Sequence, residues 1–178
     1  MTLIEVVLGD ITDETVDAIV TAANESLLGG GGVDWAVHQA AGPRLAQAGA
    51  AIAPCLPGDA MATPAFDLEP PVKYVIHTVG PVWDGGAYGE ADTLASCYRR
   101  CLQVADELQV RSIAFPAVAT GVYGFPPASA ARIAVATIRS TRTTVSLIRL
   151  VAFDQATHDL LVEATRTDDL AVEENPHR

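Results

Sequence analysis

The sequence predicts a three-layer α/β fold, in which helices cover both faces of a central sheet. Short apolar runs rich in β-branched residues alternate along the chain with longer Ala-rich stretches of helical character. Several of these apolar runs lack polar alternation, which is typical of strands that are buried on both faces. The length of 178 residues fits one domain with a core of its own.

Six apolar runs are predicted to be strands, and they lie at 3–8 (LIEVVL), 18–22 (AIVTA), 59–63, 72–79 (VKYVIHTV), 112–118 (SIAFPAV) and 146–153 (SLIRLVAF). Five stretches between or after them are predicted to be helices, at 33–41, 43–50, 91–109, 127–140 and 155–166. We expect the fourth helix to begin at FPPAS, because proline is favoured in the first helical turn, where its missing N–H would have no partner inside the helix. The polar tail 167–178, TDDLAVEENPHR, ends the pattern and is expected to be flexible.

The composition and the charge exclude several classes of protein. A hydrophobic content of 49% excludes a mainly disordered chain, and no apolar run reaches the length of a membrane span. The opening MTLIEVVLGD has no basic segment and carries acids early, so we expect no secretory signal and a cytoplasmic protein. A net charge of −11 disfavours a nucleic-acid polymer as partner, but it is compatible with a small phosphorylated ligand held by backbone N–H groups.

The cysteines and histidines indicate neither a metal site nor a disulfide framework. The cysteines are odd in number and have no metal-like spacing, so we expect small buried apolar residues at Cys55, Cys97 and Cys101. The histidines before the tail are scattered, and we expect structural roles for His38, His77 and His158.

Two glycine-rich loops, each between a predicted strand and a predicted helix, indicate an anion-binding site. They are TAANESLLGGGG at 21–32 and AVATGVYGFPP at 117–127. Each loop aims backbone N–H groups and the positive end of a helix dipole at an anion. In an open α/β sheet both loops emerge at the carboxyl ends of strands, where ligands bind. One such loop would be weak evidence, but the pair predicts a cradle for a diphosphate.

The familiar nucleotide-binding and hydrolase motifs do not fit. A G-x-G-x-x-G match from Gly29 would need glycine or alanine at Asp34, and a match from Gly30 meets Trp35. A Walker loop needs Gly-Lys, but the only lysine, Lys73, lies in the predicted strand VKYVIH. The sequence also has no Gly-x-Ser-x-Gly and no His-Glu-x-x-His. These absences disfavour a dehydrogenase-like NAD domain.

Four segments closely resemble the macrodomain family: GDIT at 9–12, AANESLLGGGGVDWAVHQAAGP at 22–43, HTVGPVW at 77–83 and ATGVYGFP at 119–126. The similarity is to the subgroup of mono-ADP-ribosyl hydrolases that also deacetylate O-acetyl-ADP-ribose, and it follows the family's order up to about residue 166. The resemblance implies a macrodomain at 1–166, built as a three-layer α/β/α sandwich with a mixed six- or seven-stranded sheet. It also implies that ADP-ribose binds across the crest of that sheet.

The resemblance assigns ligand contacts position by position. Asp10 would accept a hydrogen bond from the adenine amino group, the Ile11 backbone would help to hold the ring, and Phe153 would pack on it. Asn24 would bond the distal ribose. Two sets of residues would wrap the phosphates, from one side Gly31, Gly32 and Val33, and from the other Thr120, Gly121, Val122 and Tyr123.

Asp34 matches the catalytic aspartate of the subgroup, and we expect it to act with Asn24. A carboxylate beside a diphosphate opposes binding through like-charge repulsion, so its place beside an anion cradle favours a catalytic role. A water held between a phosphate oxygen and Asp34 would be oriented and made more nucleophilic. The other interpretation is an ordinary acid at a helix start, where the helix dipole favours negative charge.

Simpler structural roles stay open for other residues. Asn24 also fits a loop asparagine that bonds its neighbouring backbone, Asp10 fits an Asx-turn cap, and Tyr123 fits a side chain that fills its loop. Trp35 departs from the small residue that the family usually has there, and its indole either narrows the site, stacks on the distal ribose or packs in the core. The loop AVATG replaces a more usual serine-containing version, which removes a hydroxyl group.

The resemblance therefore implies a hydrolase that removes mono-ADP-ribose from acidic side chains, deacetylates O-acetyl-ADP-ribose, or does both. Each reaction releases a carboxylate, a good leaving group, so an aspartate, a water and a phosphate suffice without a metal, a cofactor or a nucleophilic cysteine. The expected partners are ADP-ribose, O-acetyl-ADP-ribose and mono-ADP-ribosylated proteins, with no membrane. The alternative is a non-catalytic module that reads ADP-ribose: Asp34 and Asn24 favour the enzyme, and an obstructing Trp35 would favour the reader.

Overall fold

The computed structural model describes residues 1–174, with side chains described as far as residue 167. Within these residues six strands form one sheet, in the order β1–β6–β5–β2–β4–β3. The strands are β1 (Leu3–Leu8), β2 (Ala18–Ala22), β3 (Ala60–Pro64), β4 (Tyr74–Thr78), β5 (Ser112–Phe115) and β6 (Leu147–Ala152). Neighbouring strands run parallel except for β3, which pairs antiparallel with β4. This mixed sheet confirms the predicted fold class.

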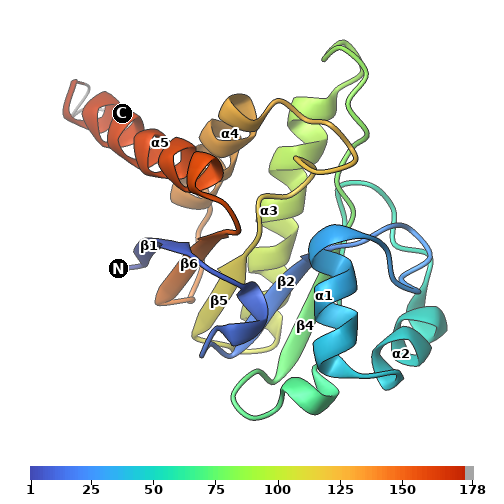
Figure 1. Ribbon diagram of the computed structural model, residues 1–178. Coiled ribbons are helices and arrows are strands. Elements are labelled where there is room, and N and C mark those ends of the chain that lie inside the picture. Colours follow the sequence, from blue (N-terminus) through green and yellow to red (C-terminus); the bar gives the residue numbers. More distant parts are fainter. Residues whose placement is uncertain (175–178) are drawn as a thin grey trace.

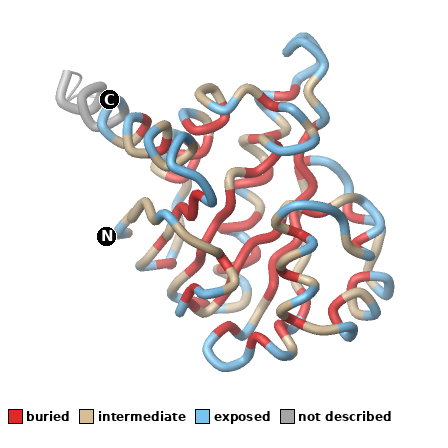
Figure 2. The backbone as a smooth tube through the Cα atoms, in the orientation of Figure 1, coloured by how far each residue is buried: buried red, intermediate tan, exposed pale blue. Residues whose placement is uncertain are grey.

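Helices lie on both faces of the sheet (Figure 1). One face is covered by α1 (Gly32–Ala41) and α2 (Arg44–Ile52), and the other by α3 (Glu90–Glu107), α4 (Pro127–Ser140) and α5 (Gln155–Glu174). Along β2, Ala18 and Val20 pack in the core under α3 and α4, whereas Ile19 packs in the core under α1. Figure 2 shows the strands as a largely buried layer between the helices. Burial on both faces explains why these strands lack polar alternation.

The predicted strands and helices are all present, with boundaries that differ in places. β5 ends at Phe115 rather than at 118, because Pro116 has no N–H to continue the ladder. α5 begins at Gln155 as predicted and continues to Glu174, beyond the expected end at 166. The remainder of the predicted tail, 175–178, lies outside the described residues. None of the helices that the structure describes is both long enough and apolar enough to cross a membrane.

Leu27 anchors the glycine-rich loop between β2 and α1 in the interior. Its side chain is completely buried and packs with Ala23, Cys55 and Val79. Its backbone adopts the left-handed conformation, with φ of 56°. α2 approaches this turn so closely that a Cβ built on Gly49 would lie 2.3 Å from the Leu27 carbonyl oxygen. A buried side chain and a helix therefore hold the base of the loop that carries the four glycines.

Replacing Gly49 with alanine tests this close contact. Alanine normally stabilises a helix interior by about 1 kcal/mol relative to glycine. Here its methyl group would be forced onto the Leu27 backbone, and overpacking of this kind costs about 1–3 kcal/mol. We expect Gly49→Ala to lower the free energy of unfolding, measured by urea denaturation. Ala50→Gly, at the next and exposed position of α2, isolates the effect of helix propensity. A Gly49→Ala protein more stable than the parent would contradict the contact.

Candidate functional site

A cleft lies at the carboxyl ends of the parallel strands, where the loops after β2, β4 and β5 meet. Its volume is about 310 Å³, which is within the range of small-molecule sites. It is lined by residues of these three loops and of the adjoining ends of β2 and α1, namely Ala22, Ala23, Asn24, Gly30, Gly31, Gly32, Val33, Gly80, Pro116, Ala117, Ala119, Gly121, Val122 and Tyr123. Both glycine-rich loops identified in the sequence therefore face one cavity.

The loop before α1 presents backbone N–H groups to the cleft. Gly31 is the N-cap residue of α1, and Gly32 is its first residue, with φ of 60°. A Cβ at either glycine would meet nothing within 4 Å, so these positions leave open space in front of the helix. The N–H groups of a first helical turn have no partner inside the helix, and the helix dipole adds partial positive charge there. This wall of the cleft suits an anionic ligand.

Asn24 and Asp34 approach each other at Gly30. A Cβ built on Gly30 would lie 3.4 Å from Asp34 Oδ2 and 3.6 Å from Asn24 Nδ2. Asn24 Nδ2 donates a hydrogen bond to the Gly29 carbonyl oxygen (3.2 Å), and Oδ1 accepts one from Ser26 Oγ (2.7 Å). Asn24 thus bonds its own loop, as a structural asparagine does, and it also lines the cleft.

Asp34 is almost completely buried, with 1% of its surface exposed, and it is not among the cleft-lining residues. Its Oδ1 accepts a hydrogen bond from Thr21 Oγ1 (2.9 Å) and lies 3.6 Å from His38 Nε2. Oδ2 has no hydrogen-bond partner among the described residues. Burial raises the pKa of the Asp34 carboxyl, although the Thr21 hydroxyl, His38 and, least, the Gly30 backbone act in the opposite direction. A buried carboxyl group with one oxygen left without a partner is a candidate for a general base.

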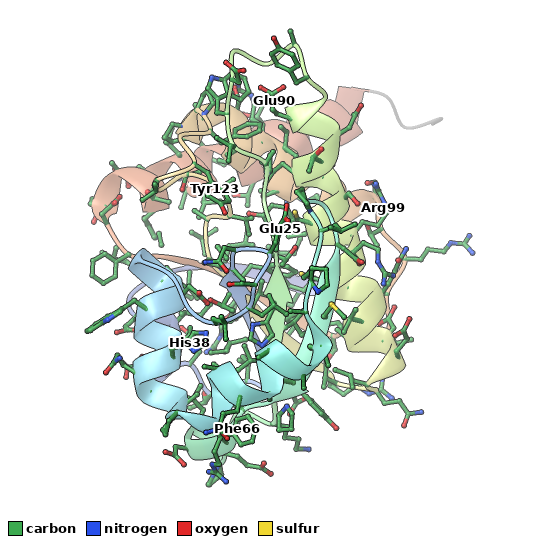
Figure 3. The ribbon with its side chains drawn as sticks, turned by 90° about the vertical axis from the view of Figure 1, so that its right-hand side faces the viewer. Glu25, His38, Phe66, Glu90, Arg99 and Tyr123 are labelled. Carbon is green, nitrogen blue, oxygen red and sulfur yellow. The ribbon has the colours of Figure 1, made fainter. Side chains whose placement is uncertain are left out.

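Two histidines lie on the same side of the sheet as Asp34: His38 is half-buried beside it, and His77 is completely buried. Figure 3 marks His38 on α1. His77, on β4, is completely buried, and its Nε2 lies 2.9 Å from Thr63 Oγ1. Burial lowers the pKa of His77 to about 4, with a smaller contribution from His38, so His77 is neutral at pH 7. Among the described residues, no group of three His, Cys, Asp or Glu side chains could hold a metal ion, and the three cysteines are free and buried.

The loop after β5 forms the opposite wall of the cleft. Ala119 has a left-handed backbone with φ of 66°, which is uncommon for a residue that carries a Cβ. Val122 is 98% exposed, and Tyr123 packs partly against the core. The structure does not place Thr120 among the cleft-lining residues, because its hydroxyl donates a hydrogen bond to the Ala117 carbonyl oxygen (2.9 Å). The Thr120 hydroxyl is therefore not directed to the cleft, and only the backbone of this residue is available to a ligand there.

The residues assigned to adenine lie outside the set that lines the cleft. Asp10 caps the short 3-10 helix η1 (Ile11–Asp13), where its Oδ1 accepts hydrogen bonds from the Thr12 N–H (2.9 Å) and Thr12 Oγ1 (2.7 Å). The Ile11 side chain is buried in the core, and Phe153 is 79% exposed just after β6. Because β1 and β6 are paired along their length, Asp10 and Phe153 emerge at the same end of neighbouring strands.

Several cleft residues were missed by the sequence reasoning, notably Gly30 and Gly80. Gly80 carries a recognisable signal, since a Cβ there would lie 2.8 Å from Ala119 Cβ. The glycine in HTVGPVW is therefore required by the close approach of two loops. The other missed residues are Ala22, Ala23, Pro116, Ala117 and Ala119. All but Pro116 lie in the two glycine-rich segments identified in the sequence, but nothing in their small apolar side chains singles them out. Trp35 is 59% exposed and outside the lining set, so its indole neither packs in the core nor obstructs the cleft.

The raised pKa of Asp34 makes stability depend on pH in a defined direction. Between the ordinary aspartate pKa of 3.8 and the raised value in the folded state, the folded protein binds more protons than the unfolded chain. Stability therefore falls as pH rises through this window. We expect Asp34→Asn to be more stable than the parent at pH 7. The gain in unfolding free energy should be about 1.4 kcal/mol for each pKa unit by which burial raises the pKa of the Asp34 carboxyl. Urea denaturation from pH 4 to pH 8 should show this gain shrinking towards pH 4. If the gain in stability did not change with pH, burial would not be its cause. Asp92→Asn, at an exposed aspartate, is the matched control.

The sequence comparisons agree with the geometry of the cleft. The Macro domain family matches residues 20–134. A macro domain-containing protein of Lactiplantibacillus plantarum is 50% identical over 168 residues, which are 92% of this chain and 96% of the relative. A protein of Salmonella newport named O-acetyl-ADP-ribose deacetylase is 51% identical over 161 residues, which are 86% of this chain and 89% of the relative.

Solved structures give the same result for the fold. The macrodomain of Oceanobacillus iheyensis with ADP is 38% identical, with a TM-score of 0.90 over 96% of this chain and 93% of that one. The Trypanosoma brucei macrodomain in complex with ADP-ribose is also 38% identical, with a TM-score of 0.83 over 90% of this chain and 68% of that one. On sequence, fold and cleft together, this chain belongs to the macrodomain family.

Proposed function

We propose that this chain is an ADP-ribose-binding hydrolase that removes mono-ADP-ribose from acidic side chains of proteins, deacetylates O-acetyl-ADP-ribose, or does both. The observation that carries the proposal is the cleft, where two loops of backbone N–H groups face each other and Asp34 meets Asn24 at Gly30. The relative named O-acetyl-ADP-ribose deacetylase and the solved macrodomains with ADP and ADP-ribose support the same substrate class.

In the proposed complex the ligand lies along the carboxyl edge of the sheet. The diphosphate sits between the N–H groups of 31–33 and those of 120–123, and Asn24 bonds the distal ribose. Adenine lies towards the ends of β1 and β6, where Phe153 packs on the ring. Because Asp10 Oδ1 already accepts two hydrogen bonds from Thr12, Oδ2 is the oxygen that accepts from the adenine amino group.

In the proposed reaction Asp34 activates a water molecule. Oδ2 is the free oxygen, and it lies next to Gly30, which lines the cleft. A water held between Oδ2 and a phosphate oxygen attacks the ribose carbon that bears the modified side chain. The carbon–oxygen bond breaks, the side-chain carboxylate leaves with the electron pair, and Asp34 accepts the proton of the water. With O-acetyl-ADP-ribose the same water attacks the ester carbonyl. The bond from the carbonyl carbon to the ribose oxygen breaks, and that oxygen takes up the proton that Asp34 accepted from the water, so that acetate and ADP-ribose are released.

A second candidate is a module that binds ADP-ribose without hydrolysing it. The near-complete burial of Asp34 and its bond to Thr21 favour this candidate, because a structural carboxylate would have the same surroundings. The position of Trp35 argues against it, since the exposed indole leaves the cleft open. Hydrolysis measured on a target ADP-ribosylated at aspartate or glutamate separates the two candidates.

ADP-ribose should stabilise the protein against heat, and NAD and adenine should do so much less. The reason is that the two phosphate loops, Asn24 and Asp10 recognise different parts of one ligand. At 100 times the dissociation constant, the gain in unfolding free energy should be about 2.7 kcal/mol. A thermal-shift titration of the three compounds measures this, and no shift at millimolar ADP-ribose would contradict ADP-ribose binding.

Replacing Asp34 with asparagine should separate catalysis from binding. The change removes the base while both phosphate loops remain, and loss of a general base lowers rates by about 10²–10⁴-fold. ADP-ribose affinity should be kept or should increase, because a negative charge near the diphosphate is removed. Released ADP-ribose reports turnover, and calorimetry reports affinity. Asp92→Asn, exposed on α3, is the control. Hydrolysis by Asp34→Asn within about threefold of the parent would exclude Asp34 as the base.

A further inference from the structure

The segment between β4 and α3 has no role in the proposed reaction, yet it leads out of the cleft. It begins at Gly80, which lines the cleft and packs against Ala119. From there it runs outward to Glu90, the first residue of α3. Figure 3 shows Glu90 and Tyr123 at the same end of the molecule. The segment therefore stands beside the wall formed by the loop after β5.

The buried carboxylate of Glu90 accepts hydrogen bonds from the backbone of this segment. Only 3% of its surface is exposed. Its Oε2 accepts hydrogen bonds from the N–H groups of Asp84 (3.0 Å) and Gly86 (2.8 Å), and its Oε1 accepts one from Tyr88 (2.6 Å). These backbone donors, that of Asp84 foremost, lower the pKa of the Glu90 carboxyl. One charged side chain therefore binds three backbone N–H groups of an otherwise exposed loop.

Trp83 transmits this order to the cleft wall. Its ring lies against Phe125, with centroids 4.8 Å apart, and a Cβ built on Gly86 would lie 2.7 Å from the indole. The backbone N–H of Trp83 donates a hydrogen bond to the Tyr123 carbonyl oxygen (2.8 Å). The indole is thus held between a loop that Glu90 fixes and the loop whose Tyr123 lines the cleft.

We propose that Glu90 is a positioning residue for the cleft wall 119–123, acting through Trp83. The carboxylate holds 84–88, this keeps Trp83 on Phe125 and Tyr123, and the wall is ordered before the ligand arrives. The ligand named in the test rests on the proposed function, whereas the contacts from Glu90 to Tyr123 do not. Glu90 touches neither the cleft nor the reacting atoms.

A simpler explanation is that Glu90 only stabilises the start of α3 through the helix dipole. Asp92 lies in the same first turn, carries the same charge and is exposed. Asp92→Ala therefore removes the same favourable charge but none of the three loop bonds. The comparison of Glu90→Ala with Asp92→Ala distinguishes loop positioning from a dipole effect.

The chain offers an internal reporter for the loop. It has two tryptophans, and a Trp35→Phe background leaves Trp83 as the single emitter. In this background Glu90→Ala should shift Trp83 emission to longer wavelength and increase its quenching by acrylamide. Glu90→Gln, which keeps one acceptor oxygen, should give an intermediate shift, and Asp92→Ala should give none.

The second readout is ADP-ribose affinity by calorimetry, with hydrolysis at saturating substrate beside it. Glu90→Ala should weaken binding about three- to tenfold, the range expected when one ordered side chain becomes mobile. Turnover at saturation should change less, because Asn24 lies on the other wall and Asp34 is buried next to Gly30 of that wall. Unchanged affinity in Glu90→Ala, or an equal loss in Asp92→Ala, would overturn the proposal. Should Glu90→Ala fail to fold, the same outcomes apply to Glu90→Gln. A parent that does not bind ADP-ribose would count against the proposed function, while Trp83 emission would still decide the role of Glu90.

Discussion

The burial of Leu27 at the base of the glycine-rich loop is the contact on which the rest of the site depends. Four consecutive glycines lose much conformational freedom on folding, and burial of one leucine side chain contributes about 1.5–3 kcal/mol against that cost. The same turn is closed by the bond from the Leu27 N–H to the Asn24 carbonyl oxygen (3.2 Å), and the Cys55 N–H donates to the Glu25 carbonyl oxygen (3.0 Å). The loop is therefore fixed at its base, while open space lies in front of Gly31 and Gly32 at its tip.

The loop after β5 is anchored in the same way, by a buried aromatic side chain. Phe125 is 1% exposed, and its N–H donates to the Ala119 carbonyl oxygen (2.9 Å), so the base of this loop is also closed. The tip, with Gly121 and Val122, extends away from that base. Both walls of the cleft thus combine an open glycine-containing tip with a large buried anchor. This arrangement lets backbone N–H groups face an anion without loss of a defined position.

The sequence predicted the features that depend on local pattern. The spacing of apolar residues indicates which side of each segment is buried, and it therefore predicted the strands, the helices and the three-layer arrangement. Strand order and the burial of Asp34 depend on packing between distant segments, and no local pattern contains them. Glu90 is the clearest case: in the sequence it is an acid at a helix start, which the helix dipole alone explains. Its three N–H partners exist only because the preceding loop folds back over it. The orientation of the Trp35 side chain could not be predicted either, because the position of a residue in a helix does not show which other segments lie next to it.

The buried carboxylates of Asp34 and Glu90 differ in how many hydrogen bonds they accept. Glu90 has both oxygens occupied by backbone N–H donors, which lower its pKa and keep it charged and fixed. Asp34 has one oxygen bound to Thr21 and one without a partner among the described residues, and burial raises its pKa. With three backbone donors bound, the Glu90 carboxylate has little capacity left for a water, so it serves to hold structure. An unsaturated carboxylate beside a cleft can bind a water and accept its proton. Hydrogen-bond saturation, rather than burial or residue type, therefore separates the structural acid from the candidate base.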